Sequence, residues 1–247
     1  MIKKPLISII TVVYNGEQNL EETILNVINQ TYDNIEFIII DGASTDGTID
    51  IIKKHEDKID YWISEKDSGI FDAMNKGILM SKGDYINFMN SGDFFTNVDL
   101  VNDVVKILNG EEIDFLYGDL NSSDGNYSHV NIKYKMQFIY QSICHQVIFA
   151  HRICFNNNMF DLKYRWMCDY KWVLECFLNK NIKEKYINKE ICYVEPIPNA
   201  VTKSDRLKKL YERAAIGHQY FFNFKKILFD INQLRLVIKF KYFWKYK

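Results

Sequence analysis

The sequence predicts an α/β protein with a mainly parallel central sheet flanked by helices. Short apolar runs at residues 6–14, 35–40, 61–64 and 85–89 have the length of buried strands, and they alternate with segments whose apolar residues recur at helical spacing. This alternation is typical of right-handed crossovers, which join parallel strands. Each run ends in a polar loop, so the four loops are expected at one edge of the sheet, where a nucleotide would lie.

The first two strands and helices have recognisable boundaries. The strand predicted over 6–14 is stopped by an Asn-Gly pair, and the apolar spacing that follows predicts a helix over 20–30. The strand over 35–40 stops at Asp41. The small and polar residues after Asp41 supply loop and capping chemistry for a helix that continues to about Lys54.

The next two strands lead to the first candidate site residue. The strand over 61–64 is followed by a polar loop at 65–69 and a helix over 70–80. The run at 85–89 ends in small and acidic residues, the last of which is Asp93. An acid after a strand is commonly a turn former or a helix cap. At the carboxyl edge of an open sheet it also projects into a ligand site, so Asp93 is a candidate ligand-handling residue.

The composition is that of a soluble globular protein, with 247 residues, 47% hydrophobic and 26% charged residues, and a formal net charge of −1. This charge gives no reason to expect nucleic-acid binding. The five cysteines form no Cys-x-x-Cys pair, which is typical of reduced thiols in the cytoplasm. No signal peptide precedes the first strand, and no apolar stretch reaches the roughly 20 residues of a membrane span. We therefore expect a cytoplasmic protein.

The loops after the strands lack the two common phosphate-binding motifs. Neither a Gly-x-Gly-x-x-Gly turn nor a Gly-x-x-x-x-Gly-Lys-Ser/Thr loop is present, which argues against a dinucleotide dehydrogenase and a phosphate-loop NTPase. A phosphate-bearing ligand would instead need a cation. Asp41, Asp67 and Asp93 are expected at the same edge and could hold it. Mg²⁺ or Mn²⁺ suits carboxylate and phosphate oxygens.

Several ordered motifs resemble a known family. Residues 5–15, 30–32 and 38–48 look like the opening of the family 2 glycosyltransferases with the GT-A fold. Residues 65–77, Glu-Lys-Asp-Ser-Gly-Ile-Phe-Asp-Ala-Met-Asn-Lys-Gly, are more specific and resemble the branch that builds bacterial capsule, colanic acid and O-antigen repeats. The resemblance covers roughly residues 5–205 and implies a nucleotide-sugar donor and an inverting reaction.

The resemblance assigns donor-side residues. Thr11, Tyr14 and Asp41 match the part of the family that holds the base and ribose, and Asp67 lies near them. Asp93 matches the end of the metal-binding Asp-x-Asp element and is the expected metal ligand.

This chain departs from the family in that element. It reads Asn-Ser-Gly-Asp over residues 90–93, so Gly92 stands where the family often carries another acid. The ribose contact made by that acid is therefore not expected from residue 92 of this chain. Weaker metal dependence or a different donor contact would follow.

The second half supplies acceptor-side candidates, after another strand predicted over 115–119. His145 and Gln146 resemble the family's His-Gln element, which faces the substrate cleft. A metal role for His145 is not expected, because no second His or Cys stands at ligand spacing. Asp169 matches the catalytic base. It also starts a predicted helix through Leu178, where a simple N-cap is the structural alternative.

The segment 196–206 resembles the family's mobile loop near the donor diphosphate, but its Asn-Ala-Val-Thr sequence departs from the Gly-Gly-Val-Ser of many relatives. Lys203 or Arg206 can reach phosphate from this loop, or can belong to a solvated basic patch. We place the domain boundary here. The GT-A domain is predicted over 1–206, with a nucleotide-sugar half over about 1–119 and an acceptor half over 120–206.

The tail over 207–247 is predicted to be helical, basic and aromatic. Residues 219–247 contain seven basic residues and one acid. The tail can pack on the catalytic domain or on a second subunit of a homodimer. It can also lie on an anionic membrane, with its aromatic rings in the interface and its cations at the headgroups, and we favour this second arrangement. No recognition module supports nucleic-acid binding.

Together these features predict an inverting glycosyltransferase of bacterial surface polysaccharide synthesis. It would transfer a hexose or N-acetylhexosamine, with a UDP-sugar as the expected donor, to a lipid-linked glycan at the inner face of the cell membrane. Asp169 would take the proton of the incoming hydroxyl, and a cation on Asp93 would stabilise the departing diphosphate. Two alternatives are a nucleotidyltransferase of similar fold and a non-catalytic glycan- or nucleotide-binding subunit of an assembly complex.

Overall fold

The computed structural model describes residues 4–122, 142–156, 158–194 and 205–220. The chain divides into two compact units, Met1–Pro198 and Asn199–Lys247. In the second unit, residues 205–220 form a helix. The predicted domain boundary after residue 206 stays a prediction.

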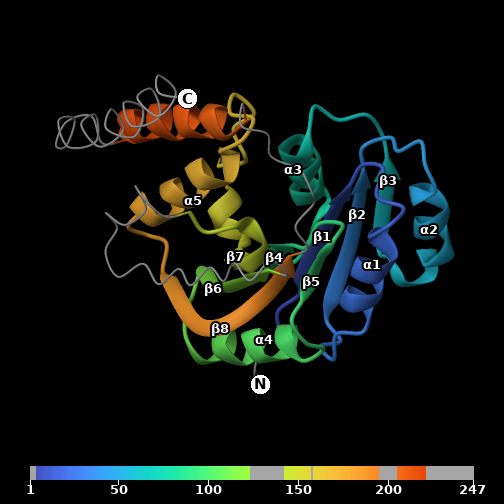
Figure 1. Ribbon diagram of the computed structural model, residues 1–247. Coiled ribbons are helices and arrows are strands. Elements are labelled where there is room, and N and C mark those ends of the chain that lie inside the picture. The colour runs from blue at the N-terminus through green and yellow to red at the C-terminus, as the bar shows by residue number, and fades with distance from the viewer. Residues whose placement is uncertain (1–3, 123–141, 157, 195–204, 221–247) are drawn as a thin grey trace. The chain divides into compact units, whose positions relative to one another are not determined.

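The first unit alternates strands and helices (Figure 1). Its first half contains β1 (Ile7–Val13), α1 (Leu20–Ile28), β2 (Ile35–Asp41), α2 (Thr48–Lys54), a 3-10 turn (Glu56–Lys58), β3 (Tyr61–Ser64), α3 (Ile70–Met80) and β4 (Tyr85–Phe88). Its second half contains β5 (Asp93–Phe95), α4 (Leu100–Gly110), β6 (Phe115–Ser122), the 3-10 helix η3 (His145–Val147), β7 (Ile148–His151), the 3-10 helix η4 (Arg152–Phe155), α5 (Cys168–Leu178) and β8 (Glu184–Val194).

These strands form one sheet in the order β3-β2-β1-β4-β7-β6-β8-β5. β1 pairs in parallel with β2 and β4, and β2 pairs in parallel with β3. The second half is mixed, because β7 is antiparallel to β4 and β6, whereas β8 is parallel to β6 and antiparallel to β5. β8 curves across the unit to reach β5 (Figure 1). The α/β class with a parallel N-terminal sheet is confirmed.

The predicted strands and helices of the first half match the structure closely. The strand over 61–64 and the helix over 70–80 have the predicted bounds, and the helix predicted over 20–30 ends at Ile28. Every residue of β1 is buried, and all of them except Ser8 and Thr11 are apolar. In the second half, the helix α4 and the strands β5, β7 and β8 were not predicted.

Helix α3 lies close to the sheet at Gly77. It packs on β1 and β2, and a Cβ atom added at Gly77 would lie 2.5 Å from Cγ2 of Ile10, a fully buried residue of β1. Gly77 therefore permits a close approach that a larger residue prevents. The loop before α3 carries Asp67, which lies beside Gly42, the residue that follows β2.

We expect Gly77→Ala to destabilise the protein, although alanine is more favourable than glycine inside a helix by about 1 kcal/mol. Overpacking of a rigid β-branched neighbour typically costs about 1–3 kcal/mol, so a net loss of about 1–2 kcal/mol should appear in urea unfolding. Gly110→Ala, at the end of α4, is the matched control because nothing lies within 4 Å of its added Cβ among the described residues. Equal shifts in the two variants would contradict this account of the packing.

An aromatic cluster anchors the second half. Trp172 of α5 stacks on Phe155 with ring centroids 4.7 Å apart, and it also contacts Phe115 and Phe160 at 5.6 and 5.5 Å. Its indole N–H donates to the Cys154 carbonyl at 3.2 Å. These contacts fix the helix whose first turn carries Asp169.

Some predicted features lie outside the described residues. These are most of the polar excursion at 121–127, the loop at 196–204 with Lys203, and the basic aromatic tail at 221–247. Within the described ranges, no helix combines the length and hydrophobicity needed to cross a bilayer.

Candidate active site

The carboxyl ends of the parallel strands lie side by side, as the sequence predicts. In the strand register, Val13 of β1 is paired with Asp41 of β2, and Asp41 with Ser64 of β3. The loop after β4 joins the same edge, because Ser91 donates its N–H to the Val12 carbonyl at 3.2 Å. Residues from four chain segments therefore meet at one edge of the sheet.

Asp41 is fully buried and organises the strand-end loops. Its Oδ2 accepts from the Ser64 hydroxyl at 2.6 Å and from the Ser44 N–H at 3.0 Å, and its Oδ1 accepts from the Ser44 hydroxyl. Three of about four acceptor positions are thus in use. A direct contact between Asp41 and a donor base stays a prediction.

Tyr14 and Asp67 gather over Gly42. A Cβ at Gly42 would lie 2.5 Å from Asp67 Oδ2 and 3.4 Å from the Tyr14 ring. Asp67 Oδ1 accepts from the Gly69 N–H at 2.8 Å, while the Tyr14 side chain is exposed. An open aromatic ring beside a carboxylate is suited to a nucleoside, and these two donor-side assignments stay predictions with compatible geometry.

Thr11 is placed differently from its predicted role. It is fully buried, and its hydroxyl donates at 2.6 Å to the carbonyl of Met89, so that it bridges β1 and the residue that follows β4. The donor contact predicted for Thr11 stays a prediction, and the observed hydrogen bond makes Thr11 a residue that holds the sheet edge together.

The segment after β4 makes a turn that returns Asp93 to the sheet. The sequence predicted Asp93 in a loop, but Asp93 begins β5 and pairs with Val194 of β8. The loop assignment is therefore wrong, and the reason is the turn at Gly92, which has a φ of +91°. This left-handed conformation favours glycine, so an acid at Gly92 would be strained.

Asp93 is a buried carboxylate with a neutral partner. It is 6% exposed, and its Oδ2 accepts from the side-chain amide of Gln146 at 3.1 Å. Burial raises the pKa of Asp93 from 3.8 to about 6, although nearby His145 and the Gln146 hydrogen bond act to lower it. A bound cation would favour the ionised form.

His145 links the site to a second carboxylate. Its ring lies between Phe71 and Phe88, with edge-on centroid distances of 6.4 and 6.3 Å. Nε2 is 2.9 Å from the Asn90 side-chain nitrogen, and Nδ1 is 3.3 Å from Asp169 Oδ2. With the Asn90 amide donating to Nε2, the ring hydrogen lies on Nδ1 and is donated to Asp169.

Asp169 lies in the first turn of α5, with its side chain partly open at 22% exposure. The helix begins at Cys168 and its N-cap is Met167, so the alternative that Asp169 is a simple N-cap is wrong. Asp169 Oδ1 accepts from the Tyr170 N–H at 2.7 Å. The carboxylate is thus held by two donors and remains accessible.

The structure brings Asp93 and Asp169 to one site through two consecutive residues. Gln146 contacts Asp93 and His145 contacts Asp169. The roles predicted for the two acids require that they lie at one site, and the sequence did not predict these bridging contacts. It also missed Asn87, a fully buried residue of β4.

Asn87 holds the bridging turn in place. Its Nδ2 donates to the carbonyls of Gln146 at 3.0 Å and Ile148 at 2.8 Å. The signal in the sequence was an asparagine inside an apolar strand, where a polar side chain requires a partner.

The residues around Asp93 fit a divalent cation that takes most of its ligands from a substrate. The side-chain oxygens of Asn90 and Gln146 are buried and have no hydrogen-bond partner among the described residues. One carboxylate with neighbouring amide oxygens is the oxygen-rich chemistry that Mg²⁺ and Mn²⁺ prefer. In the described part of the chain, no group of three acidic, His or Cys residues forms a complete metal cage. Phosphate oxygens and water would have to complete the shell.

Solved structures share this fold. A crystal structure of Staphylococcus aureus TarS (residues 1–349) in complex with UDP-GlcNAc matches with a TM-score of 0.70 and 16% identity, over 86% of this chain and 66% of that one. The mannosyltransferase PcManGT from Pyrobaculum calidifontis, in complex with GDP-Man and Mn²⁺, matches with a TM-score of 0.68 and 14% identity, over 94% and 69% of the chains. The fold is therefore that of the GT-A glycosyltransferases.

Sequence comparison defines the family. Residues 8–169 match Glycosyl transferase family 2, and the chain belongs to this family. A "PGL/p-HBAD biosynthesis glycosyltransferase" of Mycobacterium bovis is 25% identical over 222 residues, which cover 86% of this chain and 87% of that protein. An uncharacterised glycosyltransferase of Haemophilus influenzae is 45% identical over 96 residues, 38% of each chain.

Proposed function

We propose that this family 2 glycosyltransferase is an inverting, metal-dependent enzyme. It transfers a hexose or N-acetylhexosamine from a nucleotide sugar, with UDP as the expected nucleotide, to a lipid-linked glycan of a bacterial surface polysaccharide. The observation that carries the proposal is the connection of Asp93 and Asp169 through Gln146 and His145. The UDP-GlcNAc and GDP-Man complexes of the structural neighbours support a nucleotide-sugar donor.

Asp169 is the proposed general base. The acceptor hydroxyl attacks the anomeric carbon from the face opposite the diphosphate, its proton passes to Asp169, and the bond between the sugar and the diphosphate breaks. His145 and the Tyr170 N–H hold the Asp169 carboxylate by one hydrogen bond each. A base positioned in this way contributes typically about 10²–10⁴-fold in rate.

Asp93 is the proposed metal residue, with Asn90 and Gln146 as neighbouring amide groups. When bound, Mg²⁺ or Mn²⁺ supplies positive charge to the departing nucleotide diphosphate. Gln146 orients the Asp93 carboxylate, and Asn87 fixes the backbone of Gln146. The donor base is proposed to lie toward Tyr14 and Asp67.

The proposal also places the enzyme at a membrane. The acceptor is lipid-linked, and the tail after residue 220 is rich in cations and aromatic residues. We propose that this tail contacts the anionic inner face of the cell membrane. Binding to vesicles that contain anionic phospholipid, and weaker binding at high salt, would support this placement.

The test of function is the release of a nucleotide diphosphate. UDP-glucose, UDP-galactose, their N-acetyl forms and GDP-mannose would be supplied one at a time with Mn²⁺, with Mg²⁺ or with a chelator. Turnover of one donor that requires the cation supports the enzyme. Donor binding without release, even with a membrane extract as acceptor source, favours the non-catalytic binding subunit. That alternative is motivated by Gly92, which stands where the family often has an acid.

We expect His145→Gln to lower kcat about 10- to 100-fold, as is typical when the partner that orients a functional group is lost. Asparagine can place an N–H donor near the former Nδ1, whereas the longer glutamine places its amide near Nε2 and Asn90. His145→Asn should therefore retain activity within a few-fold of wild type. Steady-state kinetics over a range of donor concentrations measure kcat and the donor KM, and the donor KM should change little in both variants. An equal loss of kcat in His145→Gln and His145→Asn would show that the contact of Nδ1 with Asp169 is not what His145 contributes to kcat.

A further inference from the structure

A stripe of polar residues, which starts on α1 at Thr23 and ends at Gln30, two residues beyond the end of the helix, faces the segment that carries Asp93. Thr23, Asn26 and Gln30 follow one another at helical spacing, and all three contact residues 92–101. Thr23 and Gln30 are buried, at 0% and 8% exposure. Polar side chains on a buried helix face require partners, and here the partners are backbone groups of the segment after Gly92.

Thr23 holds the turn at Asp93 directly. Its hydroxyl oxygen accepts from the Gly92 N–H at 2.9 Å. The same hydroxyl lies 3.2 Å from the Asp93 carbonyl and 3.4 Å from the Asn19 carbonyl, to which it can donate. One buried side chain therefore fixes the backbone on both sides of the bond between Gly92 and Asp93.

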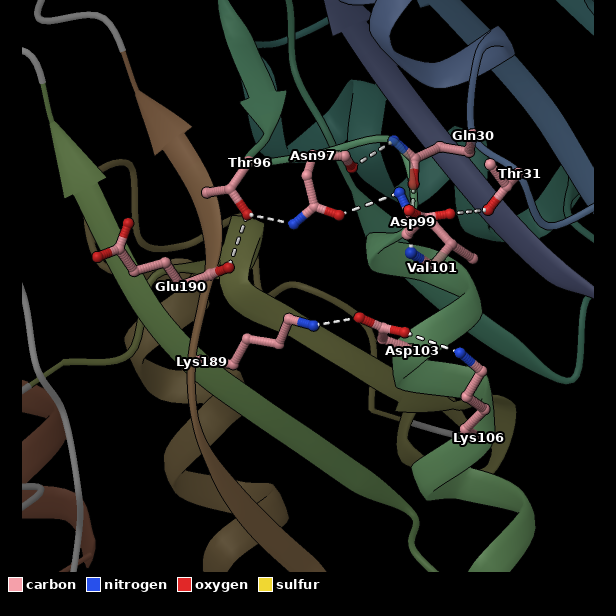
Figure 2. A network of polar contacts seen from close by, with 10 residues as sticks. All are labelled: Gln30, Thr31, Thr96, Asn97, Asp99, Val101, Asp103, Lys106, Lys189 and Glu190. Atoms are coloured by element: carbon pink, nitrogen blue, oxygen red, sulfur yellow. Dashed lines mark hydrogen bonds and ion pairs between the residues drawn. The ribbon is translucent and has the colours of Figure 1, made fainter.

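Asn26 and Gln30 continue the same pattern. Asn26 donates to the Phe95 carbonyl at 3.0 Å and accepts from the Phe95 N–H at 2.8 Å, as a neighbouring strand would. Gln30 donates to the Asn97 carbonyl at 3.0 Å and accepts from the Val101 N–H at 3.2 Å, contacts that Figure 2 shows.

The other edge of β5 is also held. β5 pairs with β8, and Thr96, the residue after β5, donates its N–H to the Ile191 carbonyl of β8 at 3.2 Å. Figure 2 shows that the Thr96 hydroxyl also donates to the Glu190 carbonyl of β8, at 2.8 Å. β5 is the terminal strand of the sheet, so the stripe on α1 occupies an edge that would otherwise be open. A three-residue strand is thereby fixed from two sides.

We propose that Thr23 and Asn26 are positioning residues for the donor side of the active site. By fixing the backbone from Gly92 to Phe95, they set where the Asp93 carboxylate stands relative to Gln146. They thereby control the affinity for a divalent cation together with a nucleotide diphosphate. This inference rests on the proposed function of Asp93. The two side chains are engaged by backbone groups, so they are inferred to act through Asp93.

The test compares Thr23→Val, which removes the hydroxyl at nearly constant shape, with Thr23→Ser, which keeps it. Asn26→Ala provides an independent change in the same stripe. Ile24→Val is the matched control, since it removes one methyl group from the neighbouring, fully buried position of α1. Two measurements are made on the full chain. Hydrogen exchange reports on residues 90–97, and calorimetry measures the binding of UDP and of GDP with Mn²⁺.

We expect Thr23→Val and Asn26→Ala to speed exchange in this peptide, because local opening becomes easier when the backbone loses its partners. Binding of the nucleotide with Mn²⁺ should weaken about tenfold, within the range typical of lost supporting contacts to a metal ligand. Thr23→Ser should restore both properties, and Ile24→Val should change neither.

Unchanged exchange or unchanged binding in both Thr23→Val and Asn26→Ala would overturn the inference. So would an equal weakening in Ile24→Val, since the effect would then follow general stability. A wild-type protein that binds neither nucleotide contradicts the proposed function instead. In that case the inferred control of donor affinity is also wrong, and the exchange data alone report whether α1 holds β5.

Discussion

Replacing Asp169 with asparagine is expected to lower kcat by about 10²–10⁴-fold, the usual contribution of a positioned general base. An amide cannot accept the proton of the acceptor hydroxyl, although it has nearly the same size as the carboxylate. Asp169 also accepts from both His145 and the Tyr170 N–H, and an asparagine has only one oxygen for these two donors. Donor binding should be retained, because the predicted donor contacts lie at the strand ends and at Asp93.

The measurement combines single-turnover kinetics with donor binding by calorimetry. Glu175→Gln is the matched control. It makes the same change of acid to amide in the same helix, at a residue that accepts from Lys171 at 2.7 Å. We expect this control to keep kcat within a few-fold of wild type. Wild-type turnover in Asp169→Asn would remove Asp169 from the chemistry and leave the base unassigned.

Much of the N-terminal half could be predicted because its elements are encoded locally. β1 and β2 are runs of apolar, mostly β-branched residues, and polar loops mark their ends. The helix α4 was within reach of the same reasoning. Leu100, Val104 and Leu108 recur at helical spacing and are buried, so the sequence contains the signal for this helix.

β8 is a different case. Its sequence mixes charged and apolar residues without a sustained alternation, and it gains its structure from partners far along the chain. It pairs in parallel with β6 and then antiparallel with β5, and such pairing depends on the curvature of the sheet. A strand that is defined by distant partners carries little local signal.

In the candidate site, the positions of the key residues along the chain could be predicted, whereas the contacts between their side chains could not. The positions of Asp93 and Asp169 could be predicted from motifs, because each lies at a recognisable boundary of a strand or helix. The contact between Gln146 and Asp93 joins residues 53 positions apart, and that between Asn90 and His145 joins residues 55 apart. No sequence pattern specifies such side-chain geometry.

The role of the polar stripe on α1 could not be predicted from the sequence. Thr23, Asn26 and Gln30 are visible in the sequence as polar residues at helical spacing, which usually indicates a solvated face. The structure places this face against β5 because an edge strand needs hydrogen-bond partners. A polar stripe that forms hydrogen bonds with backbone groups cannot be distinguished from a solvent-exposed stripe unless the position of the neighbouring strand is known.

Asp93→Asn is expected to stabilise the metal-free protein at neutral pH while it abolishes cation-dependent donor binding. Burial raises the pKa of Asp93 from 3.8 to about 6. Between these values the folded protein binds more protons than the unfolded chain, so the free energy of unfolding falls as the pH rises through this window. A pKa raised from 3.8 to about 6 lowers the free energy of unfolding by about 3 kcal/mol above pH 6. Because asparagine carries no charge, Asp93→Asn should raise the free energy of unfolding by up to about this amount at neutral pH.

Urea unfolding with a chelator, at pH 8 and at pH 4, measures the effect. The gain should be present at pH 8 and nearly absent at pH 4, where the wild-type carboxyl is largely protonated. Asp103→Asn is the control of opposite sign, because Lys189 and Lys106 lower the pKa of Asp103 and its charge is favourable at neutral pH. If Asp93→Asn lost stability equally at both pH values, Asp93 would act through its packing. The ionised carboxylate would then not destabilise the metal-free protein, contrary to the prediction.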